Sequence, residues 1–258
     1  MSSNPSNIKG IYNYCDYWCE RCVFTSRCLN FQIETKRREE FSAYTKDENE
    51  AFWTVIKENF EMARELLREF ATNGGIDLQH TGLVKPLKQA TAGSKVKIRK
   101  HFLITMGDEC IRLSRQWMDE MERMFYTTFD QEKRSISIQP KPAYSDIDIK
   151  KVTDAVEVIL WYQFQISVKI MRALHNRELV IPKTMEDGTM QNDADGSAKV
   201  ALIGLDRSIG AWNVLLTNFP KEEDRILQIL ICLNRLRKAT EKEFPTARTF
   251  IRPGFDTE

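Results

Sequence analysis

Four cysteines lie within a stretch of fourteen residues near the start of the chain, and no other residues point so firmly to one chemistry. They are Cys15, Cys19, Cys22 and Cys28, with the spacing Cys-x3-Cys-x2-Cys-x5-Cys. Cysteine thiolates bind zinc and iron–sulfur clusters, and four of them in so short a stretch can close around one metal centre. The spacing therefore predicts a metal-binding segment, without telling which reaction or signal the metal serves.

The stretch from Cys19 to Cys28 resembles a pattern found in several iron–sulfur protein families. Cys-x2-Cys-x5-Cys holds three of the four 4Fe–4S ligands in iron–sulfur DNA glycosylases, in WhiB-like regulators and in several iron–sulfur nucleases. The fourth ligand comes from upstream in those families, and the resemblance gives that place to Cys15. Many of these motifs have proline after the second cysteine of the pair, where this chain has Val23. The resemblance implies a ligand set and no function.

Other interpretations of the cysteines stay open. Structural zinc is the alternative, because four thiolates form its tetrahedron, usually as two short pairs separated by a longer linker. Free thiols rank last, since this density of thiols invites oxidation. The first three cysteines also match the radical-SAM spacing, but that class needs a strand–helix barrel and an open iron, whose place Cys28 would fill.

The composition indicates an ordinary soluble chain. The 258 residues carry 38 basic and 37 acidic side chains, a net charge of +1 that gives no general attraction to nucleic acid or anionic membranes. No secretory leader is visible, and no apolar run reaches the ~18–20 residues of a membrane span. We therefore expect a cytoplasmic protein, in which reduced thiols favour metal ligation.

Cys110 and Cys232 fall in helical apolar stripes and are expected to be small buried hydrophobes.

The apolar spacing is helical almost throughout the chain, with no convincing strand alternation. It predicts helices over about 47–73, 95–129, 145–176, 198–217 and 220–244, with a mobile polar loop at 182–197. The expected fold is all-α, a bundle of about five long helices with an N-terminal cysteine-rich metal-binding cap. The expected domains are this metal-binding segment, 1–40, and the helical bundle, 41–258.

Polar residues interrupt the apolar faces of two of these helices, namely Glu157, Lys169, Asp206 and Arg207. We favour an internal ion pair of Asp206 with Lys169 or Arg172 that fixes helix register. The alternative is a polar pocket, lined also by Trp161 and Trp212, in which an enzyme would act. A ferritin-like di-iron site is rejected, because none of the three histidines completes a Glu-x-x-His motif.

The segment Lys85–Lys100 carries six basic residues and no acid. A solvated face is the preferred interpretation, and a nucleic-acid contact is the weaker one. The sequence as a whole thus predicts a cytoplasmic 4Fe–4S protein whose cluster serves structure, redox sensing or electron transfer, with a redox or protein partner. A zinc-stapled helical interaction module and a pocket enzyme are the alternatives, so whether the chain is an enzyme stays open.

Overall fold

The structure is a computed structural model of the chain, and it describes residues 6–44, 98–121, 125–130, 135–140, 147–178, 183–184 and 190–256. The chain divides into two compact units. One comprises Met1–Tyr12 and Cys19–Ser94, and the other comprises Asn13–Trp18 and Lys95–Glu258. The division at residue 40 made from the sequence stays a prediction. The helix expected over 47–73 and most of the basic segment fall outside the described residues.

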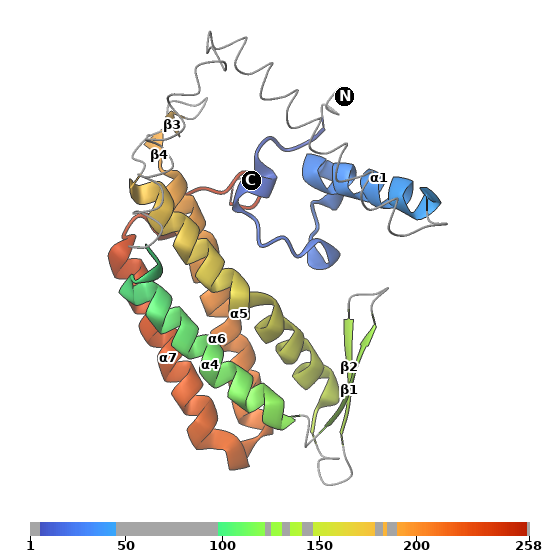
Figure 1. The fold of residues 1–258 in the computed structure, drawn as a ribbon, viewed down its shortest axis with the longest axis vertical. Helices are drawn as coiled ribbons and strands as arrows, with labels where there is room; N and C mark the ends of the chain where they lie inside the picture. Colours follow the sequence, from blue (N-terminus) through green and yellow to red (C-terminus); the bar gives the residue numbers. More distant parts are fainter. Residues whose placement is uncertain are drawn as a thin grey trace. The chain divides into compact units, whose positions relative to one another are not determined.

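The second unit contains a bundle of long helices (Figure 1). They are α4 (Phe102–Met121), α5 (Ile149–Glu178), α6 (Asp193–Asn218) and α7 (Glu223–Glu243). α5 packs along α6, and α7 packs against both α6 and α4. The all-α bundle predicted from the apolar spacing is confirmed, whereas the metal-binding cap stays a prediction. None of the helices in the described ranges combines the length and apolarity needed to cross a membrane.

The start of α6 shows why one helix boundary was missed. The Asn192 side chain accepts a hydrogen bond from the Ala194 N–H at 2.9 Å, which is an N-cap. Asp193 and Asp195 then place negative charge in the first turn, where the helix dipole favours it. The helix therefore begins five residues before the expected Ala198, inside the stretch predicted as a loop. The α7 boundary was predicted correctly, with Pro220 opening a single turn, η6 (Pro220–Glu222), ahead of the helix.

Two short antiparallel hairpins interrupt the helices. β1 (Phe125–Asp130) pairs with β2 (Ser135–Pro140), and β3 (Lys183–Thr184) pairs with β4 (Met190–Gln191). The helix predicted to reach Phe129 is thus wrong at its end, because α4 stops at Met121. The aromatic and threonine residues of β1 and the alternation Ser-Ile-Ser-Ile at the start of β2 favour strands.

Aromatic side chains fill the centre of the bundle. The Trp117 ring meets the rings of Trp212 and Phe219 edge to face, with centroids 5.3 and 5.5 Å apart. Tyr162 and Leu202 are likewise almost completely buried. Burying side chains of this size contributes most of the stability of a helical bundle, at about 1.5–3 kcal/mol for each large apolar residue.

A disulfide joins α4 to α7 through Cys110 and Cys232, which are 122 residues apart in the sequence. Their Cα atoms lie 5.7 Å apart, a normal separation for a disulfide. Cys110 lies in the apolar core, as expected, and Cys232 packs against it half-buried, but the disulfide between them was not predicted. Each lies on the apolar stripe of its helix, as the spacing predicted, but only the fold shows that the two stripes face each other.

The first unit holds three of the clustered cysteines beside α1 (Leu29–Tyr44), with the single turns η2 (Cys19–Arg21) and η3 (Thr25–Arg27). Gln32 of α1 exchanges two amide hydrogen bonds with Asn7, at 3.1 and 3.2 Å. The Ile8 N–H donates to the Arg27 carbonyl at 3.0 Å. These hydrogen bonds join the segment around Asn7 and Ile8 to α1 and to the turn that ends at Cys28. A further turn, η1, spans Ile11–Tyr14.

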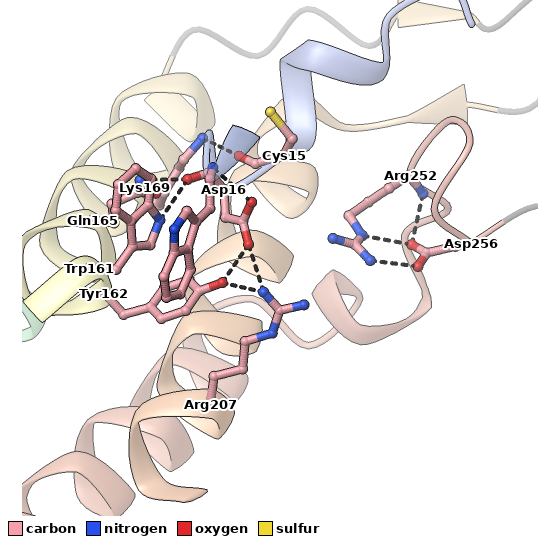
Figure 2. A network of polar contacts seen from close by, with 10 residues as sticks. Cys15, Asp16, Trp161, Tyr162, Gln165, Lys169, Arg207, Arg252 and Asp256 are labelled. Carbon is pink, nitrogen blue, oxygen red and sulfur yellow. Dashed lines mark hydrogen bonds and ion pairs between the residues drawn. The ribbon is translucent and has the colours of Figure 1, made fainter. Parts of the chain in front are cut away.

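The C-terminal tail is mostly irregular, as predicted, after the single turn η7 (Ala247–Thr249). Asp256 accepts hydrogen bonds from Arg252 at 2.9 and 3.0 Å (Figure 2). It also forms an ion pair with Lys199 at 2.7 Å. Burial raises the pKa of Asp256, but the hydrogen bonds from Arg252 and Lys199 outweigh it and hold the pKa well below its usual range. The ionised carboxylate therefore fastens the tail to α6.

Candidate functional site

The clustered cysteines belong to both units. Cys19, Cys22 and Cys28 lie in the first, and Cys15 lies in the second. All four are half-buried, and none takes part in a disulfide. The Cys22 N–H donates to the Cys19 carbonyl at 3.1 Å, and the Phe24 N–H donates to the Cys22 sulfur at 3.4 Å. The turn between Cys19 and Phe24 thus aims a main-chain donor at a thiol sulfur.

Cysteine thiols are suitable ligands for a metal centre, but the described residues are not arranged as one. Four cysteine thiols are the usual ligands of an iron–sulfur cluster or of structural zinc. Within the ranges that the structure describes, no group of three or more histidine, cysteine, aspartate or glutamate side chains could hold a metal ion. The ligand set Cys15, Cys19, Cys22 and Cys28 therefore stays a prediction from the spacing.

Asn13–Trp18, which we call the docking segment, is bound to α5 and α6 within the second unit (Figure 2). Its central residue is Asp16, whose carboxylate accepts hydrogen bonds from the Tyr162 hydroxyl of α5 and from the Arg207 guanidinium of α6, the latter at 2.7 Å. The other carboxylate oxygen accepts from the Trp18 N–H at 3.2 Å. One acidic side chain thus links the segment to both helices.

The main-chain carbonyls of the docking segment meet a row of donors on α5. The Asp16 carbonyl accepts from Trp161 Nε1 at 3.1 Å and from Gln165 Nε2 at 2.5 Å, and the Cys15 carbonyl accepts from Lys169 Nζ at 2.9 Å. A longer contact of 3.5 Å runs from Arg172 to the Asn13 carbonyl. The donors are spaced by four, four and three residues, so they lie on one face of the helix.

The docking segment adopts a sharp local conformation. Tyr17 has a φ of 57°, in the left-handed region that residues other than glycine rarely occupy. This bend places the Tyr17 ring 4.9 Å from the Lys169 ammonium, within cation–π range. It also stacks Trp18 on Trp161, with ring centroids 5.0 Å apart and the planes 15° from parallel. Strain at one residue is thus offset by contacts on both sides of it.

Burial sets the protonation of the groups beneath the segment. Burial and the hydrogen bond to Asp16 raise the pKa of Tyr162 far above its ordinary value, so this phenol stays protonated and donates to Asp16. Burial lowers the pKa of Lys169, and negative charge at Cys15 opposes that change. Within this network Lys169 donates to the carbonyl oxygen of Cys15, so this hydrogen bond does not involve the Cys15 sulfur (Figure 2).

Tyr14 anchors the start of the segment to α6. Its hydroxyl donates to Asp193 at 2.7 Å, and its ring packs edge to face on Phe250 of the tail, with centroids 4.7 Å apart. Both rings lie over Gly196, where a Cβ atom would come within 2.4 Å of the Tyr14 ring and 2.7 Å of the Phe250 ring. The absence of a side chain at Gly196 is therefore what lets the segment and the tail pack on the helix.

The structure corrects the predicted partners of the polar residues in α5 and α6. Asp206 pairs with Arg237 at 3.3 Å and with Arg248 at 2.5 Å, so the predicted pair with Lys169 or Arg172 is wrong. Lys169 reaches the docking segment, and Arg172 binds Asp193 at 3.3 Å.

A cavity lined by Trp212 does lie among the helices. Its lining includes none of Glu157, Lys169, Asp206 and Arg207, which the sequence offered as pocket residues. Trp161, the other aromatic residue expected there, binds the docking segment instead. A pocket enzyme built on these residues therefore draws no support from this cavity.

Comparisons with protein-family models, with curated proteins and with solved structures found no match to this chain.

Replacing Asp16 by asparagine is expected to lower the free energy of unfolding by about 1–3 kcal/mol, because Tyr162 and Arg207 lose a charged acceptor in a partly buried site. Urea unfolding of the purified variant measures this loss. Asp224→Asn is the matched control, since Asp224 is exposed in the first turn of α7. Equal stability of the two variants would contradict the role given to Asp16.

Proposed function

We propose that Cys15, Cys19, Cys22 and Cys28 bind one 4Fe–4S cluster, which serves structure, redox sensing or electron transfer. The observation that carries this proposal is the contrast between the two sets of cysteines. The two distant cysteines are joined in a disulfide, whereas the four clustered ones are not. Thiols that have the spacing of iron–sulfur ligands and are not oxidised to disulfides can form the thiolates that ligate iron.

The turn after Cys19 supports a ligand role for Cys22. A main-chain N–H directed at a thiolate sulfur stabilises its negative charge, and such hydrogen bonds tune the potentials of iron–sulfur clusters. When four cysteines ligate a cluster, each iron has a protein ligand, so the group supplies one-electron chemistry or a structural cross-link. We therefore do not propose catalysis at an open iron.

The docking segment supports a coupling between Cys15 and the helical bundle. The Cys15 carbonyl is held by the buried Lys169, and the next residue, Asp16, is bonded to α5 and α6. The positive charge of Lys169 near this part of the main chain offsets thiolate charge at Cys15. A ligand fixed in this way is preorganised, as contacts outside the ligand shell usually achieve.

Structural zinc is the second candidate, because a short Cys-x2-Cys turn with an N–H directed at sulfur serves zinc as well as iron. A cytoplasmic location belongs to the proposal on the strength of the four clustered thiols, whereas the disulfide between Cys110 and Cys232, a bond that is rare in that compartment, counts against it. A redox partner protein follows from the electron-transfer role.

Nucleic-acid binding through Lys85–Lys100 stays a minor alternative that rests on the basic sequence alone.

Replacing Cys22 by serine tests the ligand assignment. In anaerobically purified protein we expect about four irons and four sulfides per chain, and a loss of more than half of both in Cys22→Ser. Val23→Ser is the matched control, because Val23 is the next residue and is 83% exposed. Full retention of iron and sulfide in Cys22→Ser would refute the assignment, as would an equal loss in Val23→Ser.

A further inference from the structure

A small cavity lies among the bundle helices, away from the docking segment. Its volume is about 20 Å³, and Trp212, Leu233 and the disulfide-bonded Cys110 form part of its wall. Besides further apolar residues, four polar side chains line it, namely Ser114 of α4, Gln163 and Ser167 of α5, and Ser208 of α6. Four polar residues around one small space are unusual in a helical core, where apolar side chains prevail.

Three polar atoms of this wall are buried without a hydrogen-bond partner in the described part of the protein. They are Gln163 Oε1, Ser167 Oγ and Ser208 Oγ. Ser208 is only 3% exposed. Leaving such an atom unpaired costs about 1–3 kcal/mol, so native proteins nearly always satisfy it with protein or with ordered water.

We propose that this cavity is a binding site for one water molecule that bridges α5 and α6. A water needs about 10–15 Å³ of such volume and two to four polar partners, and the cavity offers both. Gln163 Oε1 can only accept, so the water donates one hydrogen bond to it. The hydroxyls of Ser167 and Ser208 can each donate to the water or accept from it.

Other guests fit the wall less well. A sodium-like or calcium-like cation needs six or more oxygen ligands, whereas three unpaired atoms are present here. An apolar gas would leave all three atoms unpaired. Gly107 helps to keep the space open, because a Cβ there would lie 2.8 Å from Ser167 Oγ.

The stability of Ser208→Ala distinguishes a hydrated cavity from a dry one. If a water is bound, the variant removes one of its partners, and we expect the melting temperature to fall by about 2–4 °C. If the cavity is dry, the variant removes an unpaired buried hydroxyl, and the melting temperature stays the same or rises.

Ser197→Ala is the matched control for this experiment. Ser197 lies on the same helix, is 1% exposed and also has an unpaired hydroxyl among the described residues, but it does not line the cavity. Its replacement is expected to leave the melting temperature unchanged or raised. Equal shifts in the two variants would overturn the proposal.

A direct measurement completes the test on the unmodified protein. Water-to-protein nuclear Overhauser effects, or a crystal structure at high resolution, should show one long-lived water within hydrogen-bond distance of Ser208 Oγ. Xenon applied under pressure should not bind there. Xenon in the cavity, or no water at this position, would overturn the proposal. The result does not depend on the cysteine cluster, because the cavity and the clustered cysteines share no residue.

Discussion

Reduction of the disulfide between Cys110 and Cys232 is expected to lower the free energy of unfolding by about 4–5 kcal/mol. The bond closes a loop of 122 residues, and a cross-link over a loop of that length removes much of the conformational freedom of the unfolded chain. It also joins α4 to α7, the first and last helices of the bundle in chain order. A loss of this size is comparable with half the stability of an ordinary domain.

Urea unfolding with and without a thiol reductant measures the effect. The double variant Cys110→Ala, Cys232→Ala should unfold at a lower urea concentration than the oxidised protein, and the reductant should no longer change its midpoint. Thiol labelling of the unfolded chain counts the cysteines that are not in a disulfide. We expect four of the six cysteines to react before reduction and all six after it. Six reactive thiols before reduction would contradict the disulfide and would favour a reducing compartment.

Replacing Gly196 by alanine is expected to lower the free energy of unfolding by about 2–4 kcal/mol. The new Cβ atom would clash with the rings of Tyr14 and Phe250 at distances that no side chain tolerates. Tyr14 cannot move away without losing its 2.7 Å hydrogen bond to Asp193. The variant should therefore also release the docking segment, which hydrogen exchange of the Asn13–Trp18 amides would detect.

Gly210→Ala is the control, because it makes the same change on the same helix. A Cβ at Gly210 meets no atom within 4 Å, so alanine should stabilise the protein by about 0.5–1 kcal/mol through helix propensity. Opposite signs for the two variants are expected. Equal effects would show that Gly196 carries no special packing role.

Much of the fold could be predicted from apolar spacing, because α5, α6 and α7 carry long stripes that bury on one side. The predicted helix boundaries were wrong at the end of α4 and at the start of α6, and each error has a cause in the local sequence. The apolar residues Phe125 and Phe129 continue the helical pattern of α4, so the strand preference of the threonines between them was overlooked. The Gly- and Asp-rich sequence before Ala198 suggested a loop, although it holds the N-cap at Asn192 and the first turn of α6.

The candidate site, like the fold, could be predicted only in part. The cysteines stand out by type and spacing, so the sequence identified them. The contacts that hold Cys15 and Asp16 were missed, because Lys169 donates to the Cys15 carbonyl and Trp161 and Gln165 donate to the Asp16 carbonyl. Every residue has a main-chain carbonyl, so the sequence does not show which of them accept hydrogen bonds. Their four-residue spacing on one helix face was the available signal. The disulfide and the partners of Asp206 depend on which helices face each other, which local patterns do not specify.

The most direct test of the proposed function is analysis of anaerobically purified protein by absorption spectroscopy with iron, sulfide and zinc determination. We expect a brown protein with a broad band near ~400 nm and about four irons and four sulfides per chain, as for a cluster held by four cysteines. A colourless protein that contains neither iron nor sulfide would contradict the proposal. One zinc per chain in that protein would instead make the cysteines a structural zinc site.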